Sequence, residues 1–138
     1  MKKIVIIDGQ GGKIGSLLME KLKPYESQCV LYAIGTNSIA TSAMMKAGAH
    51  VGATGENPVK VNCRDADIIT GPIGIIAADA LAGEVTPDMA VAVGQSQAQK
   101  ILMPVNRCNH HVVGVQALPI PELIGLAVQQ IVSLISTG

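Results

Sequence analysis

A glycine-rich turn near the start of the chain carries the clearest chemical pattern. Glycines let a backbone approach a bound group closely, and free N–H groups at the start of a helix favour an anion. An apolar run leads into the turn and a segment with helical apolar spacing follows it. The turn is therefore a candidate phosphate-binding loop, formed by Asp8, Gly9, Gln10, Gly11, Gly12, Lys13, Ile14 and Gly15.

The turn is a partial match to the dinucleotide-binding fingerprint Gly-x-Gly-x-x-Gly. Gly12 and Gly15 take the second and third places, whereas Gln10 stands where the first glycine belongs. A P-loop is disfavoured because no Gly-Lys-Ser/Thr triplet follows, and Lys13 precedes the last glycine. The alternative is a tight turn with no ligand, since glycines also allow a helix to pack closely on a strand.

Further loops rich in glycine or small polar residues follow the other predicted strands. Parallel strands end at one edge of a sheet, so these loops are expected to converge on a polar ligand cleft. Arg107 could pair with a phosphate or carboxylate there, or lie on the surface without a partner. Besides the turn, the predicted ligand contacts are Thr36, Asn37, Ser38, Gly71, Pro72, Ile73, Gly74, Asn106 and Arg107.

The end of the second predicted strand leaves the cofactor open. A site for NAD usually has Asp or Glu about 20 residues after the glycine turn, and a site for NADP tends to have Arg nearby. This chain has Thr36, Asn37 and Ser38 at that place. Their side chains can hydrogen-bond a ribose or a 2′-phosphate, so NAD and NADP both remain candidate cofactors.

Few residues are candidates for catalysis. Asp8 could orient a ribose or a metal-bound water, or cap the turn. Cys108, His110 and His111 suggest a metal site or a Cys-His nucleophile. Adjacent histidines at the start of a strand would face opposite sides, so we predict no metal site and assign no catalytic residue.

The segments that position these loops alternate between strand and helix. We favour a single helical turn over 59–66, where a short strand is the alternative, and expect Asn37 or Ser38 and Thr86 as N-caps. The pattern predicts one domain over residues 1–138, a three-layer, doubly wound α/β fold with a mostly parallel sheet of about six strands. The strands are predicted at 2–7, 29–34, 50–53, 67–71, 100–105 and 111–115, and the helices at 16–22, 39–46, 75–81, 87–93 and 121–136.

Composition narrows the classes of partner. The chain is 49% hydrophobic and 14% charged, so some apolar surface is expected to meet another subunit in a homo-oligomer. Ten basic and ten acidic residues balance, which argues against nucleic acid or an anionic membrane as partner. No signal peptide or membrane-spanning stretch is evident, and three widely separated cysteines fit reduced thiols, so we expect a cytoplasmic protein.

Four stretches together resemble a family of short bacterial proteins known only as a domain of unknown function. They are residues 8–15, 35–41, 71–75 and 100–108. The resemblance runs from about residue 3 to residue 116 and implies a stand-alone Rossmann-like protein from anaerobic bacteria. It implies no activity, so it assigns no functional residue.

These observations lead to two main hypotheses. The first is a Rossmann-like protein that binds a nucleotide or dinucleotide, with the phosphates at residues 9–15; as an enzyme it would be a small NAD(P)-dependent oxidoreductase. Its 138 residues leave no separate substrate domain, so a second subunit would have to close the site. The alternative is a non-catalytic ligand-sensing or accessory protein that acts through an oligomer or partner contact. A third hypothesis is a structural oligomer in which the glycines only aid packing.

Overall fold

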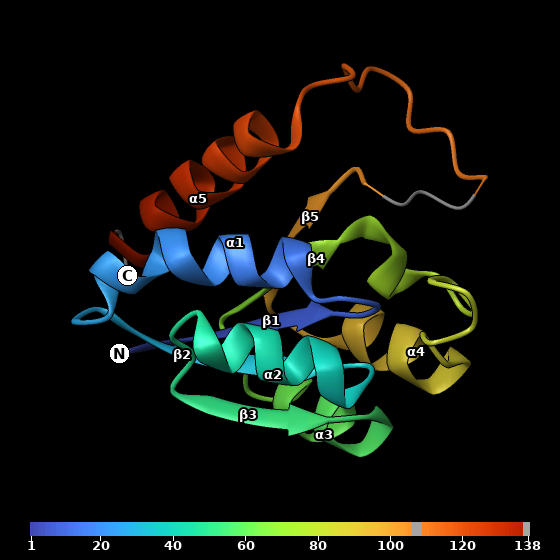
Figure 1. Cartoon of the computed structure of the whole chain (residues 1–138), viewed down its shortest axis with the longest axis horizontal. Helices are drawn as coiled ribbons and strands as arrows, with labels where there is room; N and C mark the ends of the chain where they lie inside the picture. The colour runs from blue at the N-terminus through green and yellow to red at the C-terminus, as the bar shows by residue number, and fades with distance from the viewer. Residues whose placement is uncertain (106–108, 137–138) are drawn as a thin grey trace.

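The computed structural model describes residues 1–105 and 109–136, and it contains a single parallel sheet (Figure 1). The strands lie in the order β3-β2-β1-β4-β5, which is the order of a doubly wound, Rossmann-like α/β sheet. The strands are β1 (Lys2–Asp8), β2 (Cys29–Gly35), β3 (Val51–Thr54), β4 (Ile68–Pro72) and β5 (Gln99–Met103). The helices are α1 (Lys13–Leu22), α2 (Ser38–Lys46), α3 (Glu56–Cys63), α4 (Pro87–Gln95) and α5 (Ile120–Ser136), with short 3-10 turns η1 (Lys23–Tyr25) and η2 (Ile73–Ile76).

Strand β1 lies at the centre of the sheet because its side chains suit burial on both faces. Ile4, Val5 and Ile6 are fully buried, as expected of a parallel strand covered by helices on each side. Asp8 at its end pairs in register with Gly35 of β2, and Ile6 pairs with Thr70 of β4. The carboxyl ends of β1, β2 and β4 therefore lie together at one edge of the sheet.

Helices cover both faces of the sheet and enclose two apolar cores. Helices α1, α2 and α5 pack over one face, where Leu18 and Ile131 are fully buried (Figure 1). Helices α3 and α4 cover the other face, together with the segment that follows η2. The chain leaves β1 and β4 toward opposite faces, so the strand order reverses between these two strands. In sheets of this kind, ligands bind outside the carboxyl ends of the strands at that reversal.

The predicted caps of α2 and α4 are confirmed. The side chain of Asn37 accepts a hydrogen bond from the N–H of Ala40 at 2.9 Å, and that of Thr86 accepts one from Met89 at 3.2 Å. Pro87 is the first residue of α4, where its missing N–H costs no intrahelical bond. The ambiguous segment at 59–66 is helical as far as Cys63, as favoured, but its helix α3 begins earlier, at Glu56, and residues 64–66 lie beyond its end.

The helix predicted over 75–81 is wrong beyond its first residues. The short 3-10 turn η2 ends at Ile76, and a compact turn follows in which Asp79, Leu81 and Ala82 have φ of 65°, 56° and 56°. These left-handed backbone angles cannot occur within a right-handed helix. The apolar spacing instead reflects burial, since Leu81 packs into the core as part of this turn.

The strand predicted over 111–115 does not form. Val113 is 98% exposed and Gly114 has a φ of 85°, so this stretch has neither the buried face nor the extended backbone of a strand. The described sheet therefore has five strands where about six were expected, and β5 forms one edge. Pro104, which has no N–H to donate to a neighbouring strand, lies just beyond the end of β5.

Candidate functional site

The glycine turn and the loop after β2 meet at the carboxyl edge of the sheet, as predicted. The side chain of Asn37 donates a hydrogen bond to the carbonyl oxygen of Gln10 at 2.9 Å, and the N–H of Thr36 donates one to the backbone carbonyl oxygen of Asp8 at 2.9 Å. The loop after β4 lies beside them because β4 pairs with β1. Gly71 and Pro72 are buried within β4, whereas Ile73 and Gly74 begin the η2 turn beyond it.

Asp8 shapes the glycine turn from inside the protein. It is 4% exposed, and its two carboxylate oxygens accept hydrogen bonds from Gly9 at 2.8 Å and from Gly15 at 2.7 Å. Burial raises the pKa of Asp8, and the nearby Glu84 carboxylate adds to the rise, although the N–H groups of Gly15 and Gly9 oppose it. Asp8 therefore caps the start of α1, which is the structural role weighed in the sequence analysis.

Two glycines of the turn are required by close packing. Gly12 has a φ of 74°, and a Cβ there would lie 2.8 Å from the Cα of Ala40 in α2. A Cβ on Gly15 would collide with the side chain of Met44, also in α2. The fingerprint glycines at these positions are thus explained by the contact between the turn, α1 and α2.

Gly11 and Lys13 form the open side of the turn. Both residues are exposed, and a Cβ on Gly11 would meet no heavy atom within 4 Å. Within residues 1–105 and 109–136, the N–H groups of Gly11 and Lys13 have no hydrogen-bond acceptor. Lys13 is also the first residue of α1, where the helix dipole is positive. An anion could therefore approach the turn from this side.

Glu84 is a candidate site residue that sequence analysis missed. Its Oε1 atom accepts hydrogen bonds from the N–H of Gln10 at 2.9 Å, the hydroxyl of Thr36 at 2.7 Å and the amide of Asn37 at 2.8 Å. Burial raises the pKa of Glu84, but these three hydrogen bonds outweigh that effect, so the pKa is lowered and the carboxylate is ionised at neutral pH.

The available signal for Glu84 was topological. The connection from β4 to α4 begins at the same edge of the sheet as the glycine turn, so any acidic residue in it was a candidate contact. The predicted helix over 75–81 concealed this, because it implied that the chain had already left that edge.

A cavity of about 290 Å³ lies beyond the end of β4. The predicted contacts Ile73 and Gly74 line it, and so do both His110 and His111. The expectation that these histidines would face opposite sides is wrong, because their segment is not a strand. The described residues contain no group of three His, Cys, Asp or Glu side chains able to hold a metal ion. The complete lining is Ile73, Gly74, Ile76, Ala77, His110, His111 and Val112.

Three residues named in the sequence analysis lie outside the described part of the chain. These are Asn106, Arg107 and Cys108. Ser38, in contrast, is described: it is the exposed first residue of α2, directly after the N-cap Asn37. Ser38 therefore borders the turn without contributing to the hydrogen bonds around Glu84.

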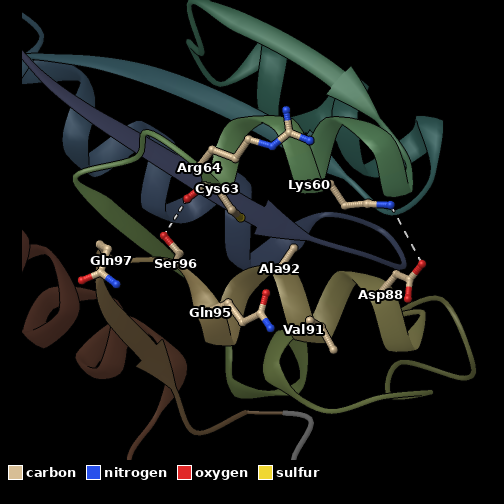
Figure 2. Close-up of a pocket in the computed structure, with 9 residues that line it drawn as sticks. All are labelled: Lys60, Cys63, Arg64, Asp88, Val91, Ala92, Gln95, Ser96 and Gln97. Carbon is tan, nitrogen blue, oxygen red and sulfur yellow. Dashed lines mark hydrogen bonds and ion pairs between the residues drawn. The ribbon is translucent and has the colours of Figure 1, made fainter.

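A second cavity, of about 440 Å³, lies between α3 and α4 (Figure 2). Lys60 and Asp88 form an ion pair at 4.0 Å on one side, and Ser96 donates a hydrogen bond to the carbonyl of Cys63 at 2.6 Å. Burial raises the pKa of Cys63 to about 11, so its thiol is protonated at neutral pH and is a poor nucleophile. This cavity includes none of the predicted site residues.

The fold and the carboxyl edge of the sheet define the class of protein, which is a Rossmann-like α/β protein with a glycine turn after its first strand. The particular family follows from its sequence profile, which matches residues 3–136, and the chain belongs to the family described as Domain of unknown function (DUF3842). This confirms that the chain resembles a family known only as a domain of unknown function. Among residues 1–105 and 109–136, no helix is both long and apolar enough to cross a membrane.

Two solved structures are similar to this chain at low sequence identity. One is an arsenate reductase in the phosphate-binding state, at 16% identity and a TM-score of 0.49, covering 99% of this chain and 98% of that one. The other is a dodecameric FMN-dependent Ubix-like decarboxylase from Escherichia coli O157:H7, at 16% identity and a TM-score of 0.43, covering 92% of this chain and 75% of that one. No curated protein sequence matches the chain.

Proposed function

We propose that this protein binds a nucleotide or dinucleotide at the carboxyl edge of its sheet. The observation that carries the proposal is the open side of the glycine turn, where the N–H groups of Gly11 and Lys13 lack an acceptor among the described residues. A phosphate there would gain two N–H donors, the positive end of α1 and the Lys13 ammonium.

The surroundings of the turn support a ligand with a group on each side of the phosphate. Asn37 and Glu84 offer polar contacts on the β2 side, which suit a ribose. The cavity beyond β4 offers apolar walls and two imidazoles, which suit a planar ring. A dinucleotide such as NAD or NADP would have this order of groups.

The enzymatic form of the proposal is a small NAD(P)-dependent oxidoreductase. The histidines of the cavity favour it, because an imidazole can give or take the proton that accompanies hydride transfer. The alternative is an accessory protein whose partner contact changes when the nucleotide binds. Turnover of bound cofactor would separate the two.

The first test is a thermal-shift and calorimetric panel of NAD, NADP, ATP, FAD and S-adenosylmethionine. A ligand that binds only the folded protein raises its stability, by about 2.7 kcal/mol when present at about 100 times its Kd. We expect stabilisation by at least one dinucleotide. No stabilisation by any member of the panel would contradict the proposal.

The variant that tests the turn is Gly11→Val. Gly11 has open space around its Cβ position, so the variant should fold, while its branched side chain should block the approach of a phosphate. We expect binding of the responding nucleotide to weaken by at least about tenfold, which is about 1.4 kcal/mol. Gly12→Val is unsuitable, because its left-handed φ and its contact with Ala40 would destabilise the fold.

The matched control is Gly94→Val in α4, where a Cβ also meets no heavy atom within 4 Å. This variant should bind as wild type does, and thermal melting should find both variants folded. Unchanged affinity in folded Gly11→Val would place the phosphate elsewhere.

A further inference from the structure

We propose that Glu84 recognises the free ribose diol of the bound nucleotide, so that the site selects ligands without a 2′-phosphate. This inference rests on the proposed function and assigns a ligand class to the same site. In this fold, the acidic residue that contacts the ribose is expected in the loop after β2. Glu84 lies outside that loop and outside the glycine turn.

The geometry leaves one oxygen of Glu84 available. Oε1 accepts all three hydrogen bonds from Gln10, Thr36 and Asn37, whereas Oε2 accepts none within the described residues. The side chain is partly exposed, so a ligand can reach it. An ionised carboxylate only accepts hydrogen bonds, and the two hydroxyls of a ribose diol are both donors.

Glu84 also lies at the place where a ribose contact is required. Thr36 and Asn37, which hold it, directly follow β2, the strand whose end carries Asp or Glu in NAD-binding folds. This chain lacks an acidic residue there, and Glu84 supplies the carboxylate from the connection between β4 and α4. The missing element of the fingerprint is thus restored by a distant part of the chain.

The connection is built to hold Glu84 in position. Val85, directly after Glu84, is 1% exposed, and Leu81, three residues before it, is 2% exposed, so the connection is anchored in the core on both sides of Glu84. The N–H of Asp79 donates to the carbonyl of Val85 at 2.7 Å, which closes the turn. A carboxylate fixed in this way needs little reorganisation to accept a ligand's hydroxyls.

Charge explains why a 2′-phosphate would be rejected. Glu84 is ionised, and the Asp8 carboxylate lies close enough to interact with it. A phosphate on the ribose would replace a hydroxyl donor with an anion beside Glu84. Like charges in a partly buried site repel more strongly than in bulk water, because the local dielectric constant is lower.

A competing explanation makes Glu84 an internal substitute for the ligand's phosphate. Its carboxylate already accepts the N–H of Gln10, as a bound anion would. In that case, removing the charge of Glu84 would strengthen the binding of every nucleotide by the same factor. Selection by the diol instead predicts a change in the ratio of two affinities, so the two explanations give different results.

The experiment is calorimetric titration of wild type and Glu84→Gln with NAD and with NADP. The glutamine keeps the length of the side chain and one carbonyl acceptor but removes the negative charge. We expect wild type to bind NAD at least about tenfold more tightly than NADP, and the variant to lose most of that preference. Glu20→Gln, an exposed change of the same type in α1, is the control and should keep the wild-type ratio.

Three results would overturn the inference. If Glu84→Gln weakens the binding of NAD and NADP equally, so that the ratio of the two affinities is unchanged, the role of Glu84 is structural. If the variant strengthens the binding of both equally, Glu84 is the internal substitute for the phosphate. In both cases the proposed function survives. If wild type binds neither dinucleotide nor any other nucleotide, the proposed function fails and the inference fails with it.

Discussion

Two carboxylates at the glycine turn have opposite environments. Asp8 is buried, and both its oxygens accept hydrogen bonds from the turn and α1. Glu84 contacts the same turn from outside, and a single one of its carboxylate oxygens accepts hydrogen bonds from the turn and from the loop after β2. Burial therefore raises the pKa of Asp8, whereas hydrogen bonds lower that of Glu84. One carboxylate shapes the turn and the other is available to a ligand.

The raised pKa of Asp8 predicts a pH dependence of stability. The protonated form of Asp8 is favoured more in the folded than in the unfolded protein. Its contribution to the stability of the fold is therefore greatest below the ordinary pKa of 3.8, and it is lost as pH rises through the raised pKa. Asp8→Asn cannot titrate. The free energy of unfolding of this variant, relative to that of wild type, should therefore increase between about pH 3 and pH 7. The increase should be about 1.4 kcal/mol for each unit by which the pKa of Asp8 is raised.

Urea unfolding at several pH values measures this difference directly. Because all other groups titrate in both proteins, subtraction isolates Asp8. A difference that stays constant with pH would mean that the pKa of Asp8 is not raised. A decrease would mean that hydrogen bonding from Gly9 and Gly15 outweighs burial.

At the scale of elements, α5 completes the core on one face of the sheet. It packs against α1 and β5, and Ile124, Ile131 and Ile135 point into the core. Only part of the apolar surface of this helix is buried, since Leu126 is 53% exposed. The helix therefore has a buried stripe that stabilises the fold and an apolar surface outside it.

Ile131→Ala and Leu126→Ala should consequently differ in their effect on stability. Ile131 is fully buried, so its truncation should lower the free energy of unfolding by about 2–5 kcal/mol. The Leu126 change should cost less than about 0.5 kcal/mol in a monomer. Chemical denaturation of both variants measures this, and equal losses would show that α5 does not pack as described.

At the scale of the whole molecule, exposed apolar side chains favour the homo-oligomer expected from composition. Ile39 is 69% exposed and Val113 is 98% exposed, on a chain that has few charged residues. We predict that light scattering after size-exclusion chromatography will give a mass at least twice that of the 138-residue chain. A monomer at all accessible concentrations would contradict this prediction.

Local patterns in the sequence predicted most of the fold, because they act within a few residues. The β-branched run before Asp8 predicted β1, and Asn37 and Thr86 predicted the starts of α2 and α4. Prediction failed where local pattern and global context disagree. Residues 111–115 contain three valines, a residue type that favours strands, but in the described structure no neighbouring strand pairs with them. Similarly, left-handed residues end the helix predicted through Leu81.

The sequence by itself determined the glycine turn, the alternation of strand and helix and the edge of the sheet at which the loops converge. Only the tertiary structure decided which residues of that edge are free. It places Ala40 against Gly12, buries Asp8 and leaves Gly11 open. It also brings Glu84 to Gln10 across 74 residues of chain. Such a contact depends on the path of the whole backbone, and no pattern of neighbouring residues encodes it.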